Sequence, residues 1–328
     1  MNKHTLIIDQ KTIKKLVSIK DAVKAVEKGF KDYGRGKVQM PPKVYLYFKK
    51  HNGDLRAMPV YDEAVDRAGI KWVNVHPGNR RKGLPTVMGL MILSDPRSGF
   101  PLAVMDATLA TALRTGAAGG VAAEYMSAKA SETVALVGCG RQACSQLEAL
   151  AAVRVIKEAR VWGKTGKEAE NFCSSVKVRG VDLLPAGTPR ECVKGADIIV
   201  TTTPARKPIV KLSWLKEGAH INAIGADAPG KQELEPSILK HSRLVVDSWE
   251  QASHSGEINV PLRRKSITRR NVYADIGEIV SGKKKGRLKE TEITVFDSTG
   301  LAVQDIVVAD LIYRKALKRG AGKKIRFM

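Results

Sequence analysis

Acidic side chains, aromatic side chains and cysteines are all scarce in this sequence. The chain of 328 residues has 33 Asp and Glu against 56 Lys and Arg, a formal net charge of +23, and 5% aromatic residues. Positive charge of this size attracts anionic cofactors and carboxylate substrates. The basic runs contain no helix-turn-helix, RRM or KH signature and no interleaved aromatics, so we expect no specific binding of nucleic acid.

The few cysteines and the lack of a long apolar run exclude two further classes of protein. Cys139, Cys144, Cys173 and Cys192 form no C-x-x-C pair, and no histidine stands at zinc-finger spacing from them, so we expect free thiols and no metal. No apolar run reaches the roughly 18 residues that span a membrane. The N-terminus also lacks the features of a signal peptide. We therefore expect a cytoplasmic protein with no membrane partner.

The hydrophobic periodicity changes along the chain and predicts two kinds of sheet. Residues 13–35 have the pattern of an amphipathic helix, in which Ser18 could cap the core segment IKDAVKAVEKGFKDY. The following strands alternate in hydrophobicity, which predicts a mostly antiparallel sheet. A helix rich in small residues is expected over 107–127. Strands and helices then alternate, which predicts an α/β fold with a Rossmann-type doubly wound parallel sheet. A long amphipathic helix is expected over 301–319.

A glycine-rich turn follows the first strand of the alternating region. The segment VALVGCGRQA runs from a strand through Gly138-x-Gly140-x-x-Ala143 into a helix. Gly138 permits a tight turn, Gly140 permits close approach of a pyrophosphate, and Ala143 takes the place of the third glycine. The N–H groups at the start of the helix favour an anion. This arrangement predicts a dinucleotide site.

An acidic residue is missing where NAD-binding folds usually have one. The second strand of this region ends at Trp162, and Gly163, Lys164 and Thr165 follow, with no carboxylate before Glu168. A carboxylate there would hold the ribose 2′-hydroxyl of NAD, whereas a lysine and a hydroxyl would bind a 2′-phosphate. The turn favours NADP. The alternative is that Lys164 is only solvated and that NAD binds through backbone contacts.

Three cations lie inside otherwise apolar segments of the first domain. They are Arg56 in DLRAMP, Lys71 in GIKWVNVHPGN and Arg114 in TALRTGAAGG. Burying a cation is costly unless it meets an anion, so the three together suggest a carboxylate pocket. Asp227 follows a predicted strand in AIGADAPGKQEL, at the edge where α/β sheets bind ligands, and it could exchange a proton there.

Several of these segments together resemble one known family. GIKWVNVHPGN, TALRTGAAGG, VGCGRQA, HINAIGADAPGKQEL and FDSTGLAVQD are similar to motifs of the ornithine cyclodeaminase/mu-crystallin family, and the nearest branch is that of archaeal alanine dehydrogenases. The resemblance implies a homodimer whose protomer has two domains. Residues 1–118 and 301–328 would form the substrate-binding and dimerisation domain, and 119–300 the Rossmann dinucleotide-binding domain.

The resemblance also implies roles for individual residues. Lys71 would contact the substrate carboxylate and exchange a proton, and Asp227 would be the acidic catalytic residue beside the reacting nitrogen. The implied substrate contacts are Lys43, Arg56, Lys71, Thr86 and Arg114. The implied contacts of the cofactor, NADP or NAD, are Arg114, Thr115, Gly138, Gly140, Arg141, Gln142, Gly163, Lys164, Thr165, Thr202, Ile224, Gly225, Asp227, Ser298 and Gly300.

The expected reaction is the reversible oxidative deamination of L-alanine to pyruvate and ammonia. Ornithine cyclodeaminases carry a Glu two residues before the Met-Pro pair that is Met58-Pro59 here, and this chain has Arg56 instead. A cation at that position argues against a bound ornithine side chain. A reductase of cyclic imines such as pyrroline-2-carboxylate is the main alternative. Ornithine cyclodeaminase and a non-catalytic NADP-dependent ligand-binding protein are the remaining ones.

Overall fold

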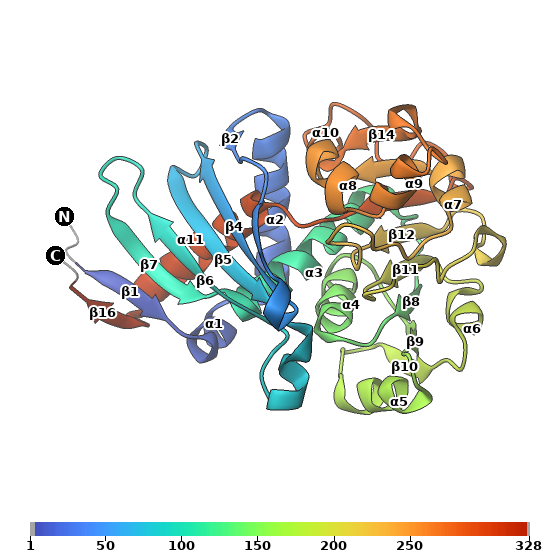
Figure 1. Ribbon diagram of the computed structural model, residues 1–328, viewed down its shortest axis with the longest axis horizontal. Helices are drawn as coiled ribbons and strands as arrows, with labels where there is room; N and C mark the ends of the chain where they lie inside the picture. Colours follow the sequence, from blue (N-terminus) through green and yellow to red (C-terminus); the bar gives the residue numbers. More distant parts are fainter. Residues whose placement is uncertain (1–3, 327–328) are drawn as a thin grey trace. The chain divides into compact units, whose positions relative to one another are not determined.

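The computed structural model describes residues 4–326, which fall into two compact units. One unit takes the chain up to Arg114 and again from Leu301 onward, and we call it the mixed-sheet unit. The other, the parallel-sheet unit, comprises Thr115–Gly300. Each unit is built around its own eight-stranded sheet (Figure 1).

The mixed-sheet unit confirms the predicted antiparallel sheet and adds short strands at its edges. Its strand order is β16-β1-β7-β6-β5-β4-β2, and β3 also pairs with β4. β1 runs parallel to β7, and the other pairs are antiparallel. The strands are β1 (Thr5–Ile8), β2 (Val38–Gln39), β3 (Val44–Phe48), β4 (Gly53–Asp62), β5 (Arg67–Val75), β6 (Val87–Ser94), β7 (Pro101–Asp106) and β16 (Lys323–Ile325).

The helix expected over 13–35 starts too early, because two helices occupy this stretch, whereas the cap expected at Ser18 is confirmed. Helix α1 (Gln10–Leu16) ends before Val17, which is extended, and α2 (Ile19–Gly34) begins afresh. Ser18 and Asp21 form a capping box at the start of α2. Such a box satisfies two N–H groups that a continuous helix would not expose, and it stabilises a new helix start.

One face of the mixed sheet is covered by α2 and by α11 (Ala302–Arg319), the predicted amphipathic helix near the chain end (Figure 1). Apolar side chains on alternate strand residues, such as Val73, Met91 and Met105, are buried. α11 packs against β4, β5 and β6, so polar side chains in the middle of this face, such as Lys71, are buried with them. This packing decides the surroundings of Lys71.

Helix α3 (Ala107–Met126) carries the chain from the mixed-sheet unit into the parallel-sheet unit. The boundary predicted after residue 118 and the observed one after Arg114 both lie within this helix. A side chain at Gly119 would collide with Gln146, so glycine is needed there for close packing. In the described part of the chain, neither α3 nor any other helix is long and apolar enough to cross a membrane.

The parallel-sheet unit is a doubly wound α/β fold, as predicted. The strand order is β10-β9-β8-β11-β12-β15-β13-β14, and all pairs are parallel. The strands are β8 (Thr133–Val137), β9 (Glu158–Trp162), β10 (Asp182–Pro185), β11 (Ile198–Thr201), β12 (His220–Ala223), β13 (Arg243–Val246), β14 (Val272–Asp275) and β15 (Thr294–Asp297). The helices are α4 (Arg141–Val153), α5 (Gly166–Ser175), α6 (Pro189–Val193), α7 (Pro236–His241), α8 (Trp249–Ser255), α9 (Asn259–Arg263) and α10 (Ile276–Val280).

Both faces of this parallel sheet are buried. Val134 and Leu136 of β8 belong to the apolar cluster that includes Leu147 of α4, whereas Ala135 and Val137 belong to a second cluster on the other face. Strands buried on both faces have continuous apolar runs, which is why they could be found in the sequence. β8 and β11 are neighbours, and the chain order reverses between them, which is where such sheets bind ligands.

Candidate active site

Lys71 lies on the helix-covered face of the mixed sheet. In β5 it is 1% exposed, whereas its neighbour Trp72 is 49% exposed on the opposite face. The strand's period of two therefore buries a lysine between apolar positions. Arg56 of β4 is buried on the same face, where it pairs through the backbone with Val73.

Asp305 of α11 joins two of the predicted cations. Its Oδ2 lies 2.7 Å from Lys71 Nζ, and its Oδ1 lies 3.1 Å from Arg114 Nε. Arg114, on α3, also donates from Nη1 to Gln304 Oε1 at 2.7 Å. Asp305 was not predicted as a site residue. Its signal was available, since a carboxylate in the apolar helix segment LAVQDIVV is as unusual as a lysine in an apolar strand.

Burial lowers the pKa of Lys71 to about 7 from its ordinary value of 10.5. The positive charges of Arg114 and, to a smaller extent, Lys43 also lower it, while Asp305 opposes them by charge and hydrogen bonding. Lys71 can therefore hold or release a proton near neutral pH. The structure thus brings Lys71 and Arg114, two of the three cations of the carboxylate-pocket hypothesis, into one electrostatic group with Lys43.

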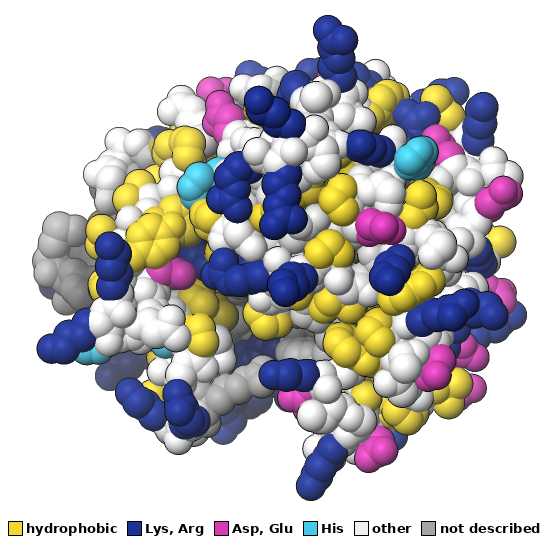
Figure 2. All heavy atoms as spheres, turned by 45° about the vertical axis from the view of Figure 1, so that its right-hand side comes forward, with side chains coloured by type: hydrophobic (Ala, Val, Ile, Leu, Met, Phe, Trp, Pro, Cys, Tyr) yellow, Lys and Arg dark blue, Asp and Glu magenta, His cyan; other side chains and the backbone are white. Residues whose placement is uncertain are grey.

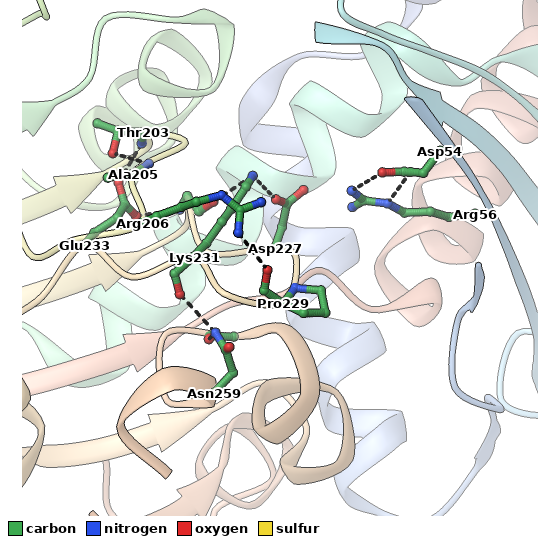
Figure 3. Close-up of polar contacts among 12 residues, drawn as sticks. Asp54, Arg56, Thr203, Ala205, Arg206, Asp227, Pro229, Lys231, Glu233 and Asn259 are labelled. Atoms are coloured by element: carbon green, nitrogen blue, oxygen red, sulfur yellow. Dashed lines mark hydrogen bonds and ion pairs between the residues drawn. The ribbon is translucent and has the colours of Figure 1, made fainter. Parts of the chain in front are cut away.

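Arg56 has a carboxylate partner within its own strand. Its Nε donates to Asp54 Oδ1 at 2.9 Å and its Nη2 to Asp54 Oδ2 at 3.3 Å (Figure 3). The guanidinium also lies 5.5 Å from the centre of the Tyr45 ring. Asp54 and Tyr45 hold Arg56 in a defined orientation. Thr86, the last predicted substrate contact, precedes β6, and its carbonyl accepts from the His76 N–H at 2.8 Å.

The glycine turn after β8 has the geometry of a pyrophosphate site. Gly138 has φ +113°, and a Cβ there would lie 2.6 Å from Thr202 Oγ1, so glycine is required. Gly140 is the N-cap of α4, and a Cβ at this position would meet no atom within 4 Å, which leaves open space in front of the helix. Arg141 and Gln142 begin α4, and no side chain caps it. These residues fit the phosphates of a dinucleotide.

The turn after β9 is closely packed, and the carboxylate that follows it, Glu168, is engaged in a hydrogen bond. A Cβ at Gly163 would lie 2.7 Å from Cys139 Sγ, so the two turns pack closely. Lys164 and Thr165 are exposed. Thr165 caps α5 by accepting the Glu168 N–H at 3.3 Å, and Glu168 reaches back to the Thr165 N–H. Glu168 is thus bound in a capping box, and Lys164 is the charged side chain that the turn presents.

Asp227 lies just beyond the carboxyl end of β12 and forms an ion pair with Lys231 (Figure 3). Lys231 Nζ also donates to the Gly225 carbonyl at 3.4 Å, and its own carbonyl accepts from Asn259 Nδ2 at 2.9 Å. Lys231 was missed in the sequence, because residues 227–231 form a loop, in which the spacing of two residues does not indicate whether their side chains meet.

The remaining predicted cofactor contacts are distributed over three parts of the parallel-sheet unit. Thr202 and Ile224 follow β11 and β12, and the Thr202 N–H donates to the Val137 carbonyl at 2.9 Å. Ser298 and Gly300 follow β15, where Asp247 Oδ2 accepts the Gly300 N–H at 2.7 Å. Thr115 lies in α3, and its carbonyl accepts from Gln146 Nε2 at 2.8 Å. All but Thr115 stand at carboxyl ends of parallel strands.

Basic side chains dominate the surface that Figure 2 displays, where Lys and Arg are spread widely and Asp and Glu are fewer. Several arginines rest on aromatic rings, such as Arg243 at 4.3 Å from the centre of Tyr273 and Arg269 at 4.5 Å from that of Trp249. The positive field of such a surface favours anionic ligands without selecting one. Within residues 4–326, no group of three or more His, Cys, Asp or Glu side chains is arranged to hold a metal ion.

Several known proteins are similar to this chain over nearly its whole length. The sequence is 53% identical to the alanine dehydrogenase of Archaeoglobus fulgidus over 98% of both chains. The structure matches a solved archaeal alanine dehydrogenase dimer with bound NAD, with a TM-score of 0.94, 53% identity, and coverage of 99% of this chain and 100% of the other. It also matches the Δ1-pyrroline-2-carboxylate reductase of Thermococcus litoralis in complex with NADH and L-proline, with a TM-score of 0.95, 38% identity, and coverage of 98% and 100%. The profile of the ornithine cyclodeaminase/mu-crystallin family matches residues 3–320, and the chain belongs to this family.

Proposed function

We propose that this chain is an NAD(P)-dependent alanine dehydrogenase, which interconverts L-alanine with pyruvate and ammonia. The observation that carries the proposal is the buried cluster of Lys71, Arg114 and Asp305, in which one carboxylate faces two cations. The excess positive charge suits the carboxylate of an amino or keto acid. The 53% identity to the alanine dehydrogenase of A. fulgidus supports alanine as the substrate.

The mixed-sheet unit would hold the substrate through its cations. Arg114 is fixed by Gln304 and Asp305, and Arg56 is fixed by Asp54. Side chains that are already oriented lose little freedom when they bind a carboxylate, so they can fix the substrate's position. Lys43 and Thr86 are further proposed contacts on this unit. A bound carboxylate would also raise the pKa of Lys71, because an anion favours the charged lysine.

Lys71 would handle a proton during the reaction. A bound nicotinamide would supply hydride transfer from and to the α-carbon of the substrate, which interconverts the amine and the iminium. The substrate ammonium must first lose a proton, and Lys71, with a pKa of about 7, can accept it. Water then adds to the iminium carbon, and ammonia leaves to give pyruvate. In the parallel-sheet unit, Asp227 is the acid that we propose to exchange protons with the reacting nitrogen.

The parallel-sheet unit would bind the dinucleotide. Gly138, Gly140 and the first N–H groups of α4 would hold the pyrophosphate, because the turn leaves open space and free donors there. For the 2′ position we propose a preference for NADP over NAD. Lys164 supports it, since it is exposed and the neighbouring carboxylate of Glu168 is engaged in its capping box.

A homodimer would form through the open face of the mixed sheet. Val44, Leu46, Trp72, Leu90 and Ile92 are large, exposed apolar side chains on β3, β5 and β6. The strand register places Val44, Trp72 and Leu90 in one row on the face opposite α2 and α11. An apolar patch of this kind marks an interface. The archaeal alanine dehydrogenase that this structure matches is a dimer, which supports a second copy of this chain as the partner.

Reduction of a cyclic imine is the second candidate. The TM-score of 0.95 to a Δ1-pyrroline-2-carboxylate reductase favours it, and a cyclic imino acid would use the same carboxylate contacts. Requirement for ammonia separates the two reactions, because pyruvate has to form its imine with ammonia and the cyclic imine already contains its nitrogen.

The test is oxidation of NADPH and of NADH with pyruvate, with and without ammonium, and with pyrroline-2-carboxylate alone. Turnover of pyruvate that depends on ammonium establishes the alanine dehydrogenase. Turnover of the cyclic imine alone establishes the reductase. Inactivity with both substrates and both dinucleotides contradicts the proposal.

A further inference from the structure

Three fully buried carboxylates in the parallel-sheet unit, Asp297, Glu257 and Glu233, are linked in series through the backbone. Asp297 Oδ1 accepts the N–H of Glu257 at 2.9 Å. The two oxygens of Glu257 accept the N–H of Glu233 at 2.9 and 3.0 Å, and Oε1 also accepts that of Leu234 at 2.6 Å. Each acid thus binds the backbone of the next. We call Asp297, Glu257 and Glu233 the carboxylate series.

Glu233, at the end of the carboxylate series, joins the carboxyl ends of two strands. Its Oε1 accepts the Thr203 N–H at 2.6 Å, just after β11. Its Oε2 accepts the Thr201 hydroxyl at 2.8 Å and the Gly225 N–H at 2.9 Å, just after β12. Figure 3 shows Glu233 beside Thr203. One buried side chain therefore fixes two turns relative to each other.

These two turns carry groups that the proposed function needs. Thr202, between the two β11-end residues that Glu233 binds, lies against Gly138 of the pyrophosphate turn. Gly225 is followed closely by Asp227, whose N–H donates to the Gly225 carbonyl at 3.1 Å. A Cβ at Gly225 would lie 2.5 Å from Glu233 Oε2, so the close contact requires glycine. Displacement of Glu233 would shift both turns.

The surroundings of the carboxylate series make it a poor device for stability. In the described part of the chain, these three carboxylates are held by N–H and O–H donors, and no ion pair to a lysine or arginine is formed. Burying carboxylates together without a cation is costly. Their mutual repulsion raises the pKa of Glu257, after burial as the larger cause, and burial raises the pKa of Asp297 to about 8. The carboxylate series therefore fixes the geometry of the two turns at a cost in stability.

We propose that Glu233 is a positioning residue for dinucleotide binding and for Asp227, with Glu257 and Asp297 holding it from behind. The inference rests on the proposed function. Glu233 touches neither substrate nor cofactor in this role. It acts through the backbone of Thr203 and Gly225, whose N–H groups it holds, and so its effect is measurable in the chain without any ligand.

The first experiment compares Glu233→Gln with Glu235→Gln. Glutamine has one oxygen and one NH2 group, so it must face the N–H of either Thr203 or Gly225 with a donor. Glu235 is the matched control, since it accepts the Leu212 N–H at 2.9 Å in the same segment but away from these turns. We expect amide exchange at Thr203 or Gly225 to accelerate about tenfold, and the Kd for NADH or NADPH to rise about tenfold, in Glu233→Gln alone.

A milder variant guards against loss of the fold. Thr201→Val removes one donor to Glu233 and keeps the shape of the side chain, and we expect a rise of about threefold in the dinucleotide Kd. Unchanged exchange and Kd in folded Glu233→Gln, or equal changes in Glu235→Gln, would overturn the positioning role. If Glu233→Gln does not fold, an unchanged Kd in Thr201→Val overturns it. Wild-type chain that binds neither NADH nor NADPH overturns the proposed function instead.

Discussion

Asp305 Oδ2 lies 2.7 Å from Lys71 Nζ, and both side chains are almost completely buried. The pair joins β5 to α11, which are far apart in the sequence but packed together in the mixed-sheet unit. Asp305 favours the protonated form of Lys71 and raises its pKa, whereas burial and the positive charge of Arg114 favour the neutral form and lower it. The balance leaves a lysine that can exchange a proton at neutral pH, which is the chemical basis of the proposed reaction.

Replacement of Asp305 by Asn is expected to lower both stability and activity. It leaves Lys71 and Arg114 facing each other in a buried site, and breaking a buried pair in this way costs about 3–5 kcal/mol. Without Asp305 the pKa of Lys71 falls further, so less Lys71 is protonated at neutral pH, and kcat/KM in the aminating direction should fall at least about tenfold. Chemical unfolding and steady-state kinetics measure the two effects.

The control for that variant is Asp310→Asn. Asp310 is also buried on α11, and it pairs with Arg67 at 3.0 Å and Arg314 at 2.7 Å. The Asp310→Asn variant should be less stable than the wild type, while its activity per folded molecule should stay near the wild-type value. An equal loss of activity in both variants would show that Asp305 has only a structural role.

The pH dependence of the rate should contain a limb near pH 7 that belongs to Lys71. In the deaminating direction kcat/KM is expected to rise through this limb, because neutral Lys71 is the base. The free energy of unfolding also rises with pH. The pKa of Lys71 in the folded chain, about 7, lies below its ordinary value of 10.5, so the unfolded chain binds more protons between these two pH values. The contribution of Lys71 to stability therefore rises with pH across that window. Lys71→Arg should abolish the limb, and a limb that persists in this variant assigns it to another group.

The two glycines of the pyrophosphate turn should respond differently to alanine. Gly138→Ala places a Cβ at φ +113° and 2.6 Å from Thr202 Oγ1, so it should destabilise the fold by about 1–3 kcal/mol. Gly140→Ala meets no atom within 4 Å, so stability should fall only by the cost of alanine at an N-cap, about 1 kcal/mol or less. Its methyl group would occupy the space of a phosphate, and the Kd for the dinucleotide should rise at least about tenfold. Normal binding by Gly140→Ala would refute the pyrophosphate assignment.

Local patterns made the two sheets predictable from the sequence. The parallel strands are buried on both faces and form apolar runs between helices, and the antiparallel strands alternate. Hydrophobic periodicity continues across the break between α1 and α2, so the helix was predicted to begin at residue 13, and only the cap expected at Ser18 marked the true start of α2. β16 is a short strand at one edge of its sheet and pairs with β1, which comes from the opposite end of the chain, and no local pattern reports this pairing.

The candidate site was only partly predictable for the same reason. Lys71 and Gly138 are marked by their local sequence, one as a cation in an apolar strand and the other in a strand-turn-helix motif. Asp305 and Glu233 act through tertiary contacts, and the sequence does not state which buried cation or N–H each one meets. Searching every apolar segment for carboxylates as well as for cations would have found Asp305 in LAVQDIVV, though not its partners. Glu233 lies in the polar segment GKQELE, which carries no such signal.

Cofactor preference should depend on Lys164. Lys164→Asp introduces a carboxylate where a 2′-phosphate would bind, so affinity for NADPH should fall about tenfold or more while affinity for NADH is kept or improved. Lys177→Asp, at another exposed lysine in the same unit, controls for the change in net charge. Fluorescence titration with both dinucleotides gives the ratio. The same ratio in both variants would mean that Lys164 is only solvated.

Oligomeric state should depend on the open face of the mixed sheet. Trp72 is 49% exposed and Leu90 is 47% exposed, and the two are direct cross-strand neighbours between β5 and β6. A charge in place of Trp72 would be buried without a partner at the interface, so Trp72→Asp should turn a dimer into a monomer. Val155→Asp is the matched control, since Val155 is an exposed apolar side chain of the parallel-sheet unit. Light scattering after size exclusion gives the mass. A monomeric wild type, or a dimer that survives Trp72→Asp, would show that this face does not join two copies, and the apolar row formed by Val44, Trp72 and Leu90 would then need another partner.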